Sequence, residues 1–136
     1  METDRVQERI AGYSGYAYPV LRVGLGMMVV LAGVHKLVNP TIWSSYIAPW
    51  ALTVLQMAGI PADLFMRANG VVETVAGLAI LGNRYTTVAA GLISLSLLGI
   101  VINMVTAGGA FLDVLIRDIG LLALAVGVTL LAAERR

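Results

Sequence analysis

The sequence contains no cysteine, a single histidine and few charged residues. Without cysteine the chain forms no disulfide, takes no part in thiol exchange and offers no thiolate to zinc or to an iron–sulfur cluster. Charged residues make up 12% of the 136 residues, whereas about 25% is usual in soluble proteins. The formal net charge of +1 argues against nucleic acid as a partner, because a domain that binds it usually carries a dense basic face.

Apolar residues are abundant instead. They make up 59% of the chain, and the mean hydropathy is +0.88. The length fits one domain. A domain with so few charged residues can have a stable surface only if most of that surface meets lipid. The sequence therefore predicts a single, small, all-α integral membrane domain over residues 1–136. It contains no zinc, phosphate-binding or serine-nucleophile motif, so we predict no metal site and assign no catalytic residue.

Four apolar segments are long enough to cross about 30 Å of hydrocarbon as helices. They cover residues 19–38, 64–81, 87–106 and 111–133. Asn83-Arg84 and Gly108-Gly109 predict tight turns between the last three, and short connections place consecutive helices antiparallel. We therefore expect an antiparallel four-helix bundle, preceded by a cytosolic arm over residues 1–18.

Residues 39–63 contain no charged residue except Asp63, so hydropathy alone leaves a fifth span open. Pro40, Pro49 and Pro61 divide the segment into pieces too short to cross. Its aromatic residues suit the membrane surface or a re-entrant segment. We expect an extracellular interfacial loop in which Trp43, Tyr46 and Trp50 form a lid or a partner-docking surface.

The basic residues favour four spans and set their orientation. With four spans, Arg5, Arg9, Arg84, Arg135 and Arg136 all lie on one side of the membrane. The opposite loops, 39–63 and 107–110, contain neither lysine nor arginine. Because basic loops stay in the cytoplasm, both termini are expected there.

Polar side chains recur inside the predicted spans, where each ionisable group costs about 2.5–3.5 kcal/mol unless it has a partner. The antiparallel order brings a set of them to the outer half of the bundle. This set, the predicted ligand-binding residues, is His35, Lys36, Asn69, Glu73, Asn103, Arg117 and Asp118. A structural role is the alternative, with Glu73–Arg117 or Lys36–Asp118 ion pairs joining helices and with Lys36 and Arg67 extending to the surface. Arg22, alone near the inner face, is expected to anchor the chain at the interface.

Small residues share helical faces with these polar groups. The faces contain Gly26, Gly33 and Lys36 in the first span and Asn69, Glu73 and Gly77 in the second. The third span gives Gly91, Gly99 and Asn103, and the fourth gives Asp113, Arg117, Gly120 and Gly127, with Asp118 beside them. Because small residues allow helices to approach closely in lipid, we expect all four faces to point into the bundle.

Two short motifs resemble those of the DoxX family. They are Gly-x-His-Lys-Leu at residues 33–37 and Glu-x-x-x-Gly-Leu at residues 73–78. The surrounding segments also resemble DoxX proteins, from about residue 19 to residue 131. These segments are 21–26, 32–40, 69–73, Gly82, Arg84 and 117–118.

The resemblance implies a four-helix protein in the plasma membrane of a prokaryote. Relatives in this superfamily are linked to quinone-dependent sulfur oxidation and redox homeostasis, and others to trafficking or assembly without shown catalysis. Carried over to this chain, the family's polar positions are Arg22, His35, Lys36 and Glu73.

Three functions follow as hypotheses. The first is a quinone-binding membrane subunit of an oxidoreductase complex, in which His35 or Lys36 donates to a quinone carbonyl, Glu73 or Asp118 supplies protons, and a redox-partner protein supplies electrons. The second is a scaffold or assembly factor whose polar core fixes the helix register. The third is a proton or small-solute transporter that uses Glu73 and functions as a homo-oligomer, because four helices rarely enclose a pathway alone.

Overall fold

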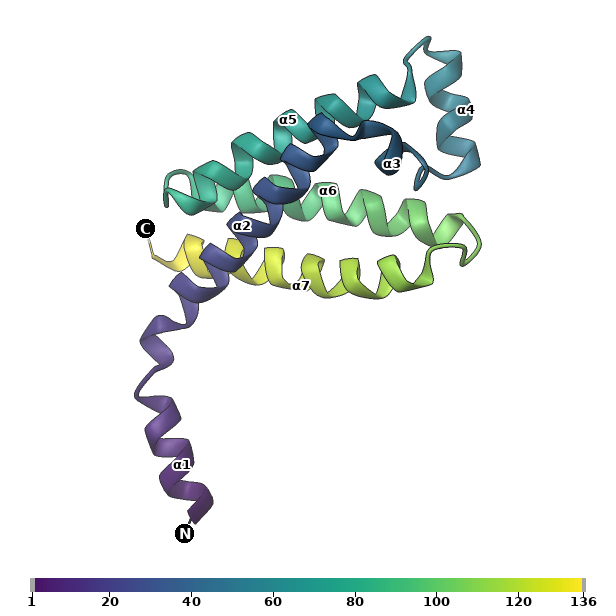
Figure 1. The fold of residues 1–136 in the computed structure, drawn as a ribbon. Helices are drawn as coiled ribbons and strands as arrows, with labels where there is room; N and C mark the ends of the chain where they lie inside the picture. The colour runs from purple at the N-terminus through teal and green to yellow at the C-terminus, as the bar shows by residue number, and fades with distance from the viewer. Residues whose placement is uncertain (1, 136) are drawn as a thin grey trace.

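The computed structural model describes residues 2–135, of which 84% are helical. The helices are α1 (Glu2–Ala11), η1 (Ser14–Tyr16), α2 (Ala17–Val38), α3 (Pro40–Ser44), α4 (Pro49–Met57), α5 (Ala62–Leu81), α6 (Thr86–Thr106) and α7 (Leu112–Glu134). Figure 1 shows that α1 projects away from the other helices. Tyr18, assigned to the arm by sequence, lies within α2 and is buried.

Four of these helices, α2, α5, α6 and α7, are long and apolar enough to cross a membrane. The prediction of an all-α integral membrane bundle is therefore confirmed. A fifth span does not form within the described residues, because the 39–63 segment contains only the short helices α3 and α4. Pro40 and Pro49 each occupy the start of one of them, where a missing N–H is tolerated.

The bundle consists of two helix pairs. Helix α2 packs mainly on α5, and α6 packs mainly on α7, while α5–α6 and α2–α7 contacts join the pairs less extensively. Figure 1 shows the pairs close together where α2 begins and α7 ends, which we call the terminal end. They diverge toward the opposite end, near α3 and α4, which we call the loop end.

An apolar core joins the pairs toward the terminal end. Its largest fully buried side chains are Leu25, Ile80 and Val128, which come from three different helices. Ala89, Ala90 and Ala125 pack among them. At this end Arg22 donates hydrogen bonds from Nη1 to the carbonyl oxygens of Ile80 and Leu81, at 2.5 and 2.6 Å. Arg22 thus caps the C-terminus of α5, and this role is additional to the interfacial anchoring that the sequence predicts.

Glycines bring the backbones of α2 and α5 into direct contact, as predicted for these two spans. A Cβ added to Gly33 would lie 2.8 Å from the Gly70 carbonyl oxygen, and one added to Gly70 would lie 2.7 Å from that of Gly33. Gly26 and Gly77 make a second crossing contact of the same kind, at 3.1–3.2 Å. Real Cβ atoms do not fit at the distances of the first contact, so the interface requires glycine there, and those of the second contact are tighter than most real Cβ contacts.

The predicted face of the third span borders an open space, since Gly99 and Asn103 line a cavity, whereas the predicted face of the fourth span is wrong. Within residues 2–135, a Cβ on Gly99, Gly120 or Gly127 meets no atom within 4 Å. The buried residues of α7 are Asp118, Ala125, Val128 and Ala132, so its inward face is rotated from the predicted one. The physical reason is that lipid is as apolar as the bundle interior, so hydrophobic periodicity does not distinguish the two.

Candidate functional site

A buried ion pair connects α2 to α5 at the loop end of their glycine contact. Lys36 Nζ lies 2.5 Å from Glu73 Oε1, and the two side chains are 3% and 9% exposed. The ammonium group also lies 4.7 Å from the centre of the Trp43 ring, a cation–π distance. Lys36 therefore points into the bundle, which corrects the alternative in which it extends to the surface.

The second oxygen of Glu73 is unsatisfied. Oε2 is buried and has no hydrogen-bond partner among the described residues. A buried carboxylate oxygen without a donor is costly, whereas hydrogen bonds to charged groups contribute about 1.5–3 kcal/mol. This atom is the clearest sign in the molecule of a missing hydrogen-bond donor.

A second ion pair lies within α7. Arg117 donates from Nε to Asp118 Oδ1 at 2.9 Å, and their side chains are 57% and 6% exposed. The interhelical pairs considered from the sequence, Glu73–Arg117 and Lys36–Asp118, are therefore replaced by Lys36–Glu73 and Arg117–Asp118.

Two adjoining cavities surround these charges. The larger, of about 490 Å³, lies among α3, α4, α5, α6 and α7 and is lined mostly by apolar and aromatic side chains. The smaller, of about 300 Å³, includes Glu73 and apolar residues of α2, α6 and α7. The residues common to both linings are Lys36, Trp43, Ser96, Ile100, Arg117 and Asp118. Three of these six are charged, so the cavities meet at a polar boundary.

Six of the seven predicted ligand-binding residues line these cavities. Lys36, Arg117 and Asp118 line both, Asn69 and Asn103 line the larger, and Glu73 lines the smaller. The Asn69 side chain makes no hydrogen bond within the described part of the chain, and the residue is half-buried. Its amide is thus available to a ligand.

His35 is the exception, because it is exposed and lies outside the linings formed by residues 2–135. Its Nδ1 accepts a hydrogen bond of 2.8 Å from Trp43 Nε1, and the two rings meet edge to face. The prediction that His35 donates to a ligand in the cavity is not supported by this placement. His35 instead orients Trp43, which does line both cavities.

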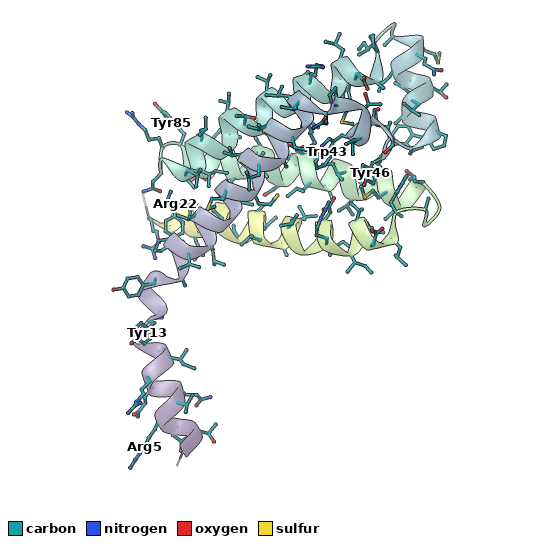
Figure 2. The ribbon with its side chains drawn as sticks, in the orientation of Figure 1. Arg5, Tyr13, Arg22, Trp43, Tyr46 and Tyr85 are labelled. Carbon is teal, nitrogen blue, oxygen red and sulfur yellow. The ribbon has the colours of Figure 1, made fainter. Side chains whose placement is uncertain are left out.

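Aromatic residues form the loop-end side of the larger cavity. Trp43, Tyr46 and Trp50 all line it, and Figure 2 shows Trp43 and Tyr46 close together beside α3. Ring contacts continue from Trp43 to Tyr46 and from Tyr46 to Phe111, with centres 6.3 and 5.1 Å apart. A row of rings therefore extends from α3 to the residue before α7.

Asn103 attaches the α3–α4 connection to α6. Its Oδ1 accepts from the backbone N–H of Ala48 at 2.9 Å, and its Nδ2 donates to the carbonyl oxygen of Tyr46 at 2.8 Å. Trp50 Nε1 adds a hydrogen bond of 2.8 Å to Thr106 Oγ1. Because both ends of the Asn103 amide are engaged, this residue shapes the cavity and is not a free donor.

Ser96 is a cavity residue that the sequence analysis missed. It lines both cavities, and its hydroxyl makes no hydrogen bond within the described residues. It lies seven residues before Asn103, a spacing that places both on one helical face. That spacing was a usable signal for Ser96.

The fold and this site define a small multi-pass membrane protein with a charged, aromatic-lined cavity at one end of a four-helix bundle. Residues 18–109 match the model of the DoxX family, and the chain belongs to that family. The match ends before α7, so Arg117 and Asp118 lie outside it. Comparisons with curated proteins and with solved structures found no match.

Proposed function

We propose that this DoxX-family protein binds a quinone in the larger cavity, as the membrane subunit of an oxidoreductase complex. The observation that carries the proposal is a cavity of about 490 Å³ with apolar and aromatic walls and a few charged or polar groups. Sites for small apolar molecules have this volume and this composition. A bound quinone would accept electrons from the partner protein that performs the oxidation.

The polar groups fit a quinone, which is an apolar ring with two carbonyl acceptors. Asn69 and Ser96 have side-chain donors that are free within residues 2–135, and the exposed Arg117 side chain lies at the charged boundary. Trp43, Tyr46 and Phe65 offer ring surfaces. In this arrangement the chain's own residues bind and orient the quinone ring.

The orientation is part of the proposal. The loop end is proposed to face the outside of a prokaryotic plasma membrane, with both termini in the cytoplasm. Arg84 at the α5–α6 turn and Arg135 after α7 lie at the terminal end, which suits the cytoplasmic side. The exposed surface of α4, including Trp50, is then available to a redox-partner protein outside the membrane.

Fluorescence titration in lipid nanodiscs tests the binding. The chain has two tryptophans, Trp43 and Trp50, and both line the larger cavity. A short-chain benzoquinone should quench their emission saturably, and Gly99→Phe should weaken the binding at least tenfold, because Gly99 lines the cavity and has room for a side chain. Gly120→Phe is the matched control, since Gly120 is exposed and lies outside both linings formed by the described residues.

The scaffold function remains the second candidate. It is favoured by the Lys36–Glu73 pair and the glycine contacts, which fix α2 against α5 without any ligand. If benzoquinone quenches wild type and Gly99→Phe equally, or fails to bind, the quinone proposal is wrong. A Gly99→Phe protein that still supports the activity of its associated complex would then favour the scaffold.

A further inference from the structure

The smaller cavity contains an acceptor without a donor. Glu73 lines this space of about 300 Å³, and its Oε2 is buried without a partner among residues 2–135. Its other oxygen, Oε1, is occupied by Lys36. The unsatisfied atom is therefore a carboxylate oxygen of a residue that lines a cavity large enough for a ring-sized group.

Each of the neighbouring charged or indole donor groups makes a hydrogen bond to another partner. Lys36 Nζ binds Glu73 Oε1, Arg117 Nε binds Asp118, and Trp43 Nε1 binds His35. Asp118, which lines the same cavity, adds a second carboxylate whose recorded hydrogen bond uses only Oδ1. Lys36 and Arg117 have further N–H groups, but within the described residues no donor makes a hydrogen bond to Glu73 Oε2.

The unpaired Glu73 oxygen specifies the chemistry of a complementary ligand. A carboxylate oxygen binds an O–H or N–H group strongly, in a charge-assisted hydrogen bond. It gains nothing from a quinone carbonyl, which is itself only an acceptor. A hydroquinone has the same ring and presents hydroxyl donors.

We propose that the smaller cavity is a specificity site for the reduced, hydroxyl-bearing form of the quinone couple, with Glu73 Oε2 as the acceptor of one hydroxyl. The inference rests on the proposed function, because it concerns the ligand proposed for the adjoining cavity. Lys36 fixes the Glu73 carboxylate, and Ser96 on the shared lining is placed to contact the ring's polar edge.

Three matched ligands test the inference. Their binding to the protein in nanodiscs is measured under argon by isothermal titration calorimetry, using a short-chain benzoquinone, its hydroquinone and the hydroquinone dimethyl ether. A chemical reductant is added only to the hydroquinone titration, because it would reduce the benzoquinone, and the protein tolerates it because the chain has no cysteine. The hydroquinone should bind roughly tenfold more tightly than the quinone, as expected for one hydrogen bond to a charged group. The dimethyl ether, which lacks donors, should lose this advantage.

A double variant removes the acceptor without leaving a lone buried charge. Lys36→Met combined with Glu73→Leu should reduce the preference for hydroquinone over benzoquinone from tenfold to less than twofold. Ser94→Ala is the control, because Ser94 donates to the Ala90 carbonyl oxygen within α6 and lies outside both linings of the described residues. The Ser94→Ala protein should keep the full preference.

The outcomes separate the two proposals. If none of the three ligands binds, the proposed function fails. If benzoquinone binds as tightly as the hydroquinone, or more tightly, quinone binding stands and the donor-specific site is overturned. The wild-type comparison decides this point even if the double variant does not fold.

Discussion

The two helix pairs of the bundle are held together in different ways. Helices α2 and α5 touch through their backbones at Gly33 and Gly70, and a buried ion pair lies beside that contact. Between α6 and α7, a Cβ added to Gly91 would make an ordinary 3.8 Å contact with Thr129, and the other packing is by side chains. The α2–α5 interface therefore tolerates little change, whereas the α6–α7 interface accepts larger substitutions.

The first prediction, with the largest effect, concerns the ion pair. Lys36→Met should destabilise the protein by about 3–5 kcal/mol, because it leaves the Glu73 carboxylate buried without its partner. Unfolding by denaturant in detergent micelles, followed by circular dichroism, measures this change. Adding Glu73→Leu should recover most of the stability, and a double variant as unstable as the single one would show that the charge imbalance is not the cause.

The second prediction concerns the glycine contact. Gly33→Ala should destabilise by about 1–3 kcal/mol, because the new methyl group would meet the backbone of Thr74 and Gly70 at less than 3 Å. Gly120→Ala on α7 is the control and should be neutral or stabilising by up to about 1 kcal/mol, since alanine favours a helix over glycine. The same unfolding assay compares the two, and equal effects would contradict the difference between the interfaces.

The third prediction concerns the link between α6 and the α3–α4 connection. Asn103→Leu should destabilise by about 1–3 kcal/mol, because the buried Ala48 N–H loses its acceptor. Hydrogen exchange should also increase at residues 46–48. Unchanged exchange there would show that the connection is held by other contacts.

The smallest effect is expected at Thr106. Thr106→Val removes the acceptor of the Trp50 indole, but both residues are exposed, so water replaces the bond. Stability should change by less than about 1 kcal/mol. A blue or red shift of the tryptophan emission spectrum without a loss of stability would agree with this expectation.

Much of the arrangement follows from the sequence because chain connections fix it. Antiparallel order is enough to bring Lys36, Glu73 and Asp118 to the same end of the bundle, and small residues identify the contact between α2 and α5. The actual ion pairs depend on helix rotation, which the nearly uniform apolar surfaces of α6 and α7 do not encode. The role of His35 was not predictable, because its partner Trp43 belongs to a segment too short to show a period.

Arg22 and Lys36 both join α2 to α5, the first at the α5 C-terminus and the second near the middle of α5. They are about 21 Å apart along α2, from the rise per residue. Two attachment points at this separation oppose both sliding and rotation of one helix against the other. Helices α2 and α5 are therefore held rigidly against each other. Any expansion of the cavities needed to admit a ligand must come from movement of α3, α4 and the α6–α7 hairpin.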